Sequence, residues 1–442
     1  MALKLLLVTP EYPPDFGGGI TTFYRDLVPA LWKQGCEVRV LRGSAFVHGA
    51  EAYHHKCTSV VTLETARYRK WLERFGHFAM FPDTRCHLAA AFAMHEQADA
   101  GEGFDAVEVT DWGLLFLPWV LQTKAQVLVQ MHGSTGQIAV HEPADGRATE
   151  GVFQMLLERA ILAAAPRLSS SSRANIEWWQ TVLHRPVHYL PPPLDLKATR
   201  VEEKNHTNKW LSVARIQEWK GPQIACAAWE LLGGSAPRLE WMGRDTKQLA
   251  TGESMDSSLR DQFPDTWGRT IQPIGQFSPQ QVQQRMGAAK AVLVPSTWDV
   301  FNLAAAEAMA MGSVVVISDG AGAVDLVQRG VSGFGFPNRD AAALAQLVRQ
   351  VESLSDEELR AIGQNAAVTV RERLNPERIA AAKLKLYASP PQSQAMEIGW
   401  LSEALLPKTK TAPLTFLSAL PLKDLTSYVA RRGLTKLWGG QN

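Results

Sequence analysis

Two successive runs of short apolar segments alternating with helical patterns constrain the fold of this chain most strongly. In the first run, segments such as Leu3–Val8 and Val127–Met131 alternate with helix-like stretches such as Thr21–Gln34. The alternation restarts with segments such as Lys209–Val213 and Ala291–Val294. Apolar strands without strict polar alternation, separated by helices, are typical of a parallel sheet covered on both faces. We therefore expect an α/β protein.

Three consecutive prolines, Pro191–Pro193, separate the two runs, and neither a helix nor a central strand can continue through them. Two α/β units of similar size, in a chain of 442 residues, predict two doubly wound, Rossmann-like parallel-sheet domains. Ligands of such sheets bind outside the carboxyl ends of the strands, so the loops that follow the strands are the places to search for a site.

The composition excludes several classes of protein. With 46% apolar and 20% charged residues, the chain has an ordinary globular composition. Lys and Arg number 45 against 44 Asp and Glu, a balance that argues against a nucleic-acid partner. The four cysteines form no C-x-x-C pair, so we expect neither a zinc site nor a disulfide scaffold. No apolar run reaches 18 residues, and we expect a cytoplasmic protein, at most attached to a membrane surface.

The last segment, 391–442, differs in composition from the rest. It carries six Lys or Arg against three Asp or Glu, a net charge of +3, with Leu, Trp and other apolar residues interleaved. One interpretation is a terminal helix that covers part of the core. The other is a basic amphipathic extension that lies on an anionic membrane.

Glycines 17–19 form the first candidate site, in the loop between the first strand and its helix. Gly17, Gly18 and Gly19 would let the backbone approach a ligand, and the helix start would offer N–H groups to an anion. The run does not match G-x-G-x-x-G, which disfavours a dinucleotide dehydrogenase. Taken alone, a glycine run is more often a turn.

Arg215 and Lys220 directly follow the Lys209–Val213 strand. At the carboxyl end of a strand, the guanidinium and the ammonium group could converge on one anion, for which a diphosphate is the natural choice. The alternative is a pair of solvated cations beside a turn.

Asp299 and Glu307 lie eight residues apart at the start of, and within, a helix. The N–H groups of Phe301, Asn302 and Leu303 would face outward as a second anion site. Glu307 is surrounded by Ala and Met, so a polar partner is expected for its buried carboxylate. The structural alternatives are an N-cap for Asp299 and a partner for a buried backbone group or arginine for Glu307.

The ordered set of these motifs resembles the retaining glycosyltransferase family 4, among the group 1 glycosyl transferases of the GT-B fold. Arg215-x4-Lys220-Gly221 resembles the family's R-x4-K-G element, and the segment Pro295–Gly312 resembles its signature with two carboxylates eight apart. Pro192–Asp195 resembles its interdomain turn, and Gly320–Val327 its G-G-x-x-E-x-V loop.

The resemblance implies a domain organisation. Residues 1–192 would form the acceptor-side domain and 193–373 the nucleotide-sugar domain, facing each other across a cleft. Residues 374–390 would form a crossover helix that returns to the first domain, and 391–442 the extension.

The resemblance also implies roles for individual residues. His132, after a strand, would lie near the reacting sugar, Asp299 would contact the donor sugar, and Glu307 would accept from the ribose hydroxyls. Asp111 would contact the acceptor at best. The donor diphosphate would be held by Gly17, Gly18, Gly19, Arg215, Lys220, Phe301, Asn302 and Leu303.

The implied activity is retaining transfer of a hexose from a nucleotide sugar to a glycan or lipid-linked acceptor, in cell-surface polysaccharide synthesis. No D-x-D-type cluster occurs at a strand end, and we expect no metal and no other cofactor. The enzyme would be cytoplasmic, with the extension on the inner membrane face. Three departures from the family pattern, Asp299 for Glu, Asn302 for Gly and Asp325 for Glu, leave a catalytically silent sugar-nucleotide-binding protein as the alternative.

Overall fold

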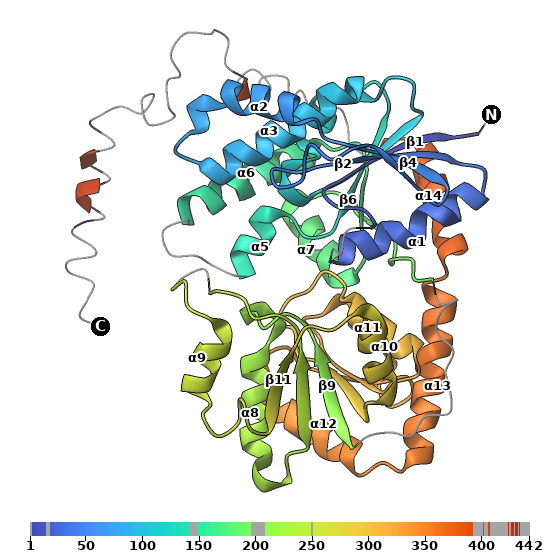
Figure 1. Ribbon diagram of the computed structural model, residues 1–442, viewed down its shortest axis with the longest axis vertical. Helices are drawn as coiled ribbons and strands as arrows, with labels where there is room; N and C mark the ends of the chain where they lie inside the picture. The colour runs from blue at the N-terminus through green and yellow to red at the C-terminus, as the bar shows by residue number, and fades with distance from the viewer. Residues whose placement is uncertain are drawn as a thin grey trace.

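The computed structural model describes residues 2–14, 18–141, 148–195, 208–248 and 251–391, with a few residues between 401 and 433. Two α/β domains lie one above the other, and the last helices run along one side of both (Figure 1). Each domain is built on its own, mostly parallel sheet, which confirms the predicted fold class.

The first sheet has eight strands in the order β3-β4-β2-β1-β5-β6-β7-β8, and only the pairing of β3 with β4 is antiparallel. Its central strands are buried and apolar because helices cover both faces. The strands are β1 (Lys4–Thr9), β2 (Glu37–Arg42), β3 (Tyr53–His55), β4 (Thr58–Thr62), β5 (Ala106–Thr110), β6 (Gln126–Met131), β7 (Leu168–Ser170) and β8 (His188–Tyr189). The helices are α1 (Gly19–Lys33), α2 (Thr65–Arg74), α3 (Pro82–Gln97), α4 (Leu117–Leu121), α5 (Thr135–His141), α6 (Ala148–Ala164) and α7 (Arg173–Leu183).

The second sheet has six parallel strands in the order β11-β10-β9-β12-β13-β14. The strands are β9 (Lys209–Val213), β10 (Arg238–Met242), β11 (Ile271–Gly275), β12 (Ala291–Val294), β13 (Val315–Ser318) and β14 (Phe334–Phe336). The helices are α8 (Pro222–Leu232), α9 (Met255–Gln262), α10 (Pro279–Ala288), α11 (Leu303–Ala310), α12 (Ala341–Glu352) and α13 (Asp356–Arg373).

The final long helix, α14 (Pro376–Ala388), leaves the second domain and packs on α1 of the first. Ile379 and Tyr387 are buried in the same apolar cluster as Tyr24 and Leu27 of α1. The chain therefore completes the core of its first domain with its last long helix.

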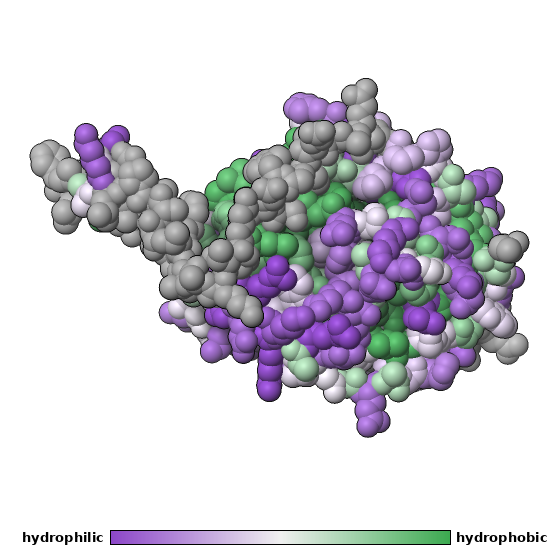
Figure 2. Space-filling view, turned by 90° about the horizontal axis from the view of Figure 1, so that it is seen from above, coloured by the Kyte–Doolittle hydropathy of each residue, from purple (hydrophilic) through white to green (hydrophobic). Residues whose placement is uncertain are grey.

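The described residues of the 391–442 extension lie partly on the first domain. Leu401 and Leu405 are buried in its core cluster, and the carbonyl of Leu405 lies 3.0 Å from Nε2 of His77. These contacts support the structural interpretation for the start of the extension, whereas most of its basic residues lie outside the described residues. Figure 2 shows hydrophilic residues over much of the upper face, with hydrophobic residues gathered in a few areas between them.

Candidate active site

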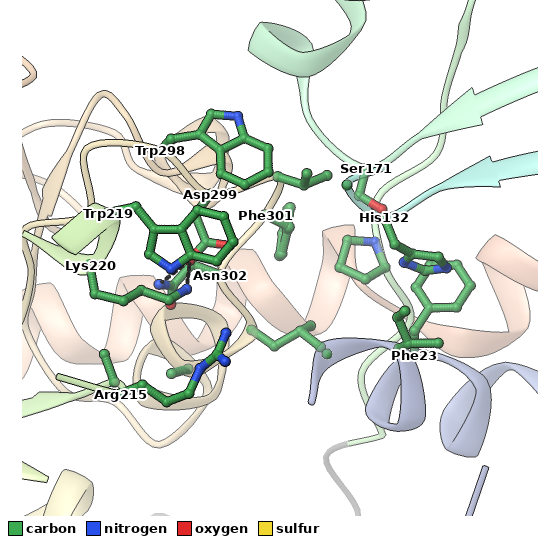
Figure 3. Close-up of a pocket in the computed structure, with 18 of the residues that line it drawn as sticks. Phe23, His132, Ser171, Arg215, Trp219, Lys220, Trp298, Asp299, Phe301 and Asn302 are labelled. Atoms are coloured by element: carbon green, nitrogen blue, oxygen red, sulfur yellow. Dashed lines mark hydrogen bonds and ion pairs between the residues drawn. The ribbon is translucent and has the colours of Figure 1, made fainter. Parts of the chain in front are cut away.

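A cavity of about 320 Å³ lies between the two domains, where the carboxyl ends of strands from both sheets meet. The first domain contributes His132 and Gly133 after β6, and Gly19 at the start of α1. The second contributes Arg215 after β9 and residues 298–304 after β12. Figure 3 shows the two walls facing each other, with His132 opposite the polar groups of the second domain. This placement agrees with the rule for doubly wound sheets.

The loop after β6 is held from below by a buried carboxylate. The backbone N–H of His132 donates to Oδ1 of Asp111 at 2.8 Å, and that of Gly133 donates to Oδ2 at 3.2 Å. Asp111 is fully buried, and burial raises its pKa to about 7. Its carboxylate is thus engaged with the loop instead of facing an acceptor, which corrects the acceptor-side role expected for Asp111.

A second buried carboxylate holds the same loop and was not singled out from the sequence. Oε2 of Glu158 accepts from the hydroxyl of Ser134 at 2.6 Å and from the N–H of Gly136 at 3.0 Å. Burial raises the pKa of Glu158 to about 8. In the sequence Glu158 is followed by Arg159, and two adjacent charged residues in a helix usually indicate a solvent-exposed face. The sequence therefore offers no reason to predict that Glu158 is buried.

The His132 ring lies against two aromatic rings of α1. Phe23 meets it edge to face at 4.9 Å between centroids and Tyr24 at 5.6 Å. Burial, and the nearby charge of Lys383, lower the pKa of His132 to about 3. The imidazole is therefore neutral at physiological pH, and in that form one ring nitrogen can donate a hydrogen bond and the other can accept one.

The second wall carries the two predicted cations. Arg215 and Lys220 both line the cavity, and Figure 3 shows their side chains on the same side of it. Gly221 follows Lys220 directly and has φ 73°. It lies so close to the Pro295 carbonyl that a Cβ would approach the carbonyl oxygen to 2.0 Å. Only glycine fits there.

Asp299 accepts from two side chains through a single oxygen. Its Oδ2 lies 2.5 Å from Nζ of Lys220 and 2.9 Å from Nδ2 of Asn302. The Lys220 and Asp299 side chains are 16% and 18% exposed, so the ion pair is largely shielded from water. Because Asp299 accepts from Asn302 through its side chain and does not cap the helix itself, the N-cap interpretation does not hold.

Asn302 takes the N-cap position of α11 instead. It adopts a left-handed conformation with φ 75°, and its Oδ1 accepts the N–H of Ala305 at 2.9 Å. Asparagine tolerates this conformation better than most residues, which explains how it replaces glycine here. Within the described residues, the N–H groups of Leu303 and Ala304 make no hydrogen bond, and both residues line the cavity. These N–H groups are therefore available to a ligand at this helix start, and the diphosphate role expected for Phe301, Asn302 and Leu303 stays a prediction.

The glycine run contributes less than expected. Gly17 lies outside the described residues. The N–H of Gly18 donates to Oε1 of Glu11 at 3.1 Å, as does that of Thr21, so Glu11 already occupies the start of α1. Gly19 does line the cavity, and a Cβ on it would lie 3.6 Å from Leu303 across the domain boundary.

Glu307 is not among the residues that line this cavity. Its half-buried carboxylate makes no hydrogen bond within the described residues, and burial raises its pKa to about 6, although the charge of Arg25 opposes the shift. The role at the ribose stays a prediction.

An aromatic stack between Trp298 and His141 joins the two domains beside the cavity. Trp298, after β12, stacks on His141 at the end of α5 at 4.4 Å between centroids, and it also packs against Trp219 at 5.0 Å. Trp298 thus forms a flat, apolar wall above Asp299 (Figure 3).

Among the described residues, no group of three or more His, Cys, Asp or Glu side chains could hold a metal ion. No helix in that part of the chain combines the length and apolar character that a membrane span needs.

Comparison with known proteins gives consistent similarities. Residues 197–369 match the model of the family described as Glycosyl transferases group 1. The chain is 27% identical over 314 residues to the D-inositol 3-phosphate glycosyltransferase of Nocardia farcinica (strain IFM 10152), which covers 64% of this chain and 68% of that protein.

Solved structures resemble the whole two-domain arrangement. Sucrose-phosphate synthase from Thermosynechococcus elongatus gives a TM-score of 0.67 at 21% identity, covering 87% of this chain and 98% of the other. An Anabaena protein solved in complex with UDP-glucose gives a TM-score of 0.61 at 14% identity, covering 87% of this chain and 99% of the other. These similarities show that the chain has the GT-B fold.

Proposed function

We propose that this chain, whose residues 197–369 belong to the group 1 glycosyltransferases, is a retaining transferase that moves a hexose from a nucleoside-diphosphate sugar to a glycan or glycolipid-type acceptor. The observation that carries the proposal is the second wall of the cavity. Arg215, Lys220 and the unbonded N–H groups that begin α11 lie together, directly opposite His132. Such an arrangement suits an anion of two phosphates.

The diphosphate is the leaving group of the proposed reaction. As the bond between the anomeric carbon and the diphosphate oxygen breaks, negative charge grows on that oxygen. Arg215, Lys220 and the helix N–H groups are already in place to stabilise this charge, so little reorganisation is needed. A nucleotide donor is supported by the related fold solved with UDP-glucose.

Retention by attack on the same face of the sugar is supported by the lack of a free carboxylate nucleophile among the described residues that line the cavity. Among the described residues that line it, only Asp299 carries a carboxylate, and its Oδ2 is held by Lys220 and Asn302. A carboxylate paired in this way is a poor nucleophile. We therefore propose that the acceptor hydroxyl oxygen bonds to the anomeric carbon on the face the diphosphate leaves, and that its proton passes to the departing phosphate oxygen.

The sugar would lie between the two walls. Oδ1 of Asp299, His132 and the Trp298 ring surround the space beside the diphosphate site, and they offer hydrogen-bonding groups and an apolar face. Hexoses present hydroxyls around the rim and C–H groups on one face, so this combination fits their chemistry. We propose cell-surface glycans as the setting, with the enzyme in the cytoplasm and its extension on the membrane.

The test has two stages. Uridine, guanosine and adenosine diphosphates are screened for thermal stabilisation, and the sugar nucleotides of the base that binds are then assayed for release of the diphosphate. NMR of the product reports the anomeric configuration. Binding with retention of configuration supports the proposal, inversion overturns the mechanism, and binding without turnover supports the catalytically silent alternative.

A further inference from the structure

A buried polar cluster joins the last helix of the chain to the candidate active site. Nζ of Lys383, on α14, lies 2.7 Å from Oε2 of Glu108 on β5, and both side chains are 0% exposed. Lys383 also donates to Oε1 of Gln130 at 2.6 Å, and the hydroxyl of Tyr387 donates to Oε2 of Glu108 at 2.5 Å. A buried ion pair of this kind is costly unless its remaining donors and acceptors find partners, and here both Glu108 oxygens and two of the three ammonium protons of Lys383 are hydrogen-bonded.

Tyr24 connects this cluster to His132. The hydroxyl of Tyr24 lies 3.1 Å from Oε1 of Glu108, and Nε2 of His132 lies 3.5 Å from the same hydroxyl. A carboxylate can only accept, so Tyr24 must direct its proton to Glu108. Burial raises the pKa of Tyr24 well above its ordinary value, and the hydroxyl keeps that proton.

The direction of these bonds determines which nitrogen of His132 carries its proton. With its own proton committed to Glu108, the Tyr24 oxygen offers a lone pair to the imidazole and can only accept from it. A neutral imidazole has one N–H, so Nδ1 is then an acceptor. Within the described residues Nδ1 makes no hydrogen bond, and His132 lines the cavity.

We propose that Tyr24, Glu108 and Lys383 are positioning residues, which hold His132 as the Nε2–H tautomer and leave Nδ1 to accept from a sugar hydroxyl in the cavity. The inference rests on the proposed function in that the hydroxyl belongs to its substrate. The edge-to-face contact with Phe23, 4.9 Å between centroids, restrains the ring in the same orientation.

The cluster itself supplies a matched pair of variants. Tyr24→Phe and Tyr387→Phe each remove one buried hydroxyl that bonds Glu108, and of the two hydroxyls only that of Tyr24 also lies within reach of His132. A purely structural role for the cluster predicts similar effects of the two changes. The positioning role predicts that only Tyr24→Phe alters the imidazole.

The tautomer is read by long-range ¹H–¹⁵N NMR on protein labelled with ¹⁵N-histidine, with a His132→Gln sample to identify the signals. We expect the Nε2–H form in the wild type and after Tyr387→Phe, and a mixture of tautomers after Tyr24→Phe. We also expect Tyr24→Phe to lower kcat about tenfold, the value of one neutral hydrogen bond, with KM for the donor within about twofold of the wild type. Tyr387→Phe should retain the wild-type kcat.

An Nδ1–H tautomer in the wild type overturns the proposal without any variant. So does an unchanged tautomer in Tyr24→Phe, or an equal loss of kcat in both variants. If no sugar nucleotide is turned over by the wild type, the proposed function fails, whereas the spectra still support or overturn the positioning role.

Discussion

Replacing Lys220 with alanine probes the phosphate-binding wall most directly. The lysine ammonium lies 2.5 Å from Oδ2 of Asp299, and its side chain is only 16% exposed. A charge-assisted hydrogen bond to a phosphate oxygen in such a shielded site contributes about 1.5–3 kcal/mol. Lys220→Ala should therefore weaken nucleoside-diphosphate binding by about tenfold to a hundredfold.

Lys209 provides a control that separates the loss of phosphate binding in Lys220→Ala from a general loss of positive charge. Lys209 forms a similar pair with Glu240, at 2.6 Å in the same domain, but it does not line the cavity. Lys209→Ala removes the same type of group and should leave the affinity unchanged. Isothermal titration with the nucleoside diphosphate measures both variants.

Asp299→Asn supplies the opposing change. Because the Asp299 carboxylate would repel a diphosphate bound beside Lys220, removing its charge should leave the affinity for the bare diphosphate the same or slightly higher. Turnover of the complete sugar nucleotide should fall, since Asp299 is expected at the sugar. The reasoning is refuted if Lys220→Ala binds like the wild type, or if Asp299→Asn weakens the bare diphosphate as much as Lys220→Ala does.

Three further predictions concern other parts of the molecule. Because the pKa of Glu158 is raised to about 8, the folded protein keeps a proton that the unfolded chain releases near pH 4.5. The free energy of unfolding should therefore fall as pH rises from 4.5 to 8. Urea midpoints at pH 5 and pH 8 should show this fall, by up to a few kcal/mol, in the wild type and a smaller one in Glu158→Gln. Deleting residues 407–442 should abolish co-sedimentation with anionic vesicles and leave Tm unchanged. Deleting residues 392–442 should also lower Tm, because Leu401 and Leu405 no longer cover the first-domain core. Equal losses of Tm in the two deletions would show that residues 407–442 are structural as well. Turnover should persist in EDTA, since the cations and helix N–H groups of the second wall neutralise the diphosphate; activity lost in EDTA and restored by Mg²⁺ or Mn²⁺ would contradict this.

The sequence predicted the central strands of both sheets because burial on both faces leaves an apolar run. Lys209–Val213 and Ala291–Val294 were predicted to the residue. Helix α3 was not predicted, because it is buried on nearly all sides from Thr84 to Met94 and so lacks an amphipathic period. The short edge strands β3 and β8 carry too few residues for a pattern.

The candidate site was predictable where a motif is local and not where a contact joins distant segments. Arg215, Lys220 and Asp299 follow strand ends in a recognisable order, and the structure brings them to one cavity with His132. The pairing of Asp299 with Lys220 spans 79 residues, and no local pattern encodes it. Asp111 was marked by its strand end, but only the fold shows that its carboxylate faces the backbone of the His132 loop.

The return of α14 to the first domain sets an order of events during synthesis. Glu108 is separated by 275 residues from Lys383, its buried partner. At about 5–20 residues per second, the ribosome adds Lys383 about 14–55 s after Glu108. During that interval Glu108 and the apolar face of α1 have no covering helix, so the first domain to leave the ribosome should be the last to become native. A fragment that ends before α14 should accordingly require chaperones or aggregate.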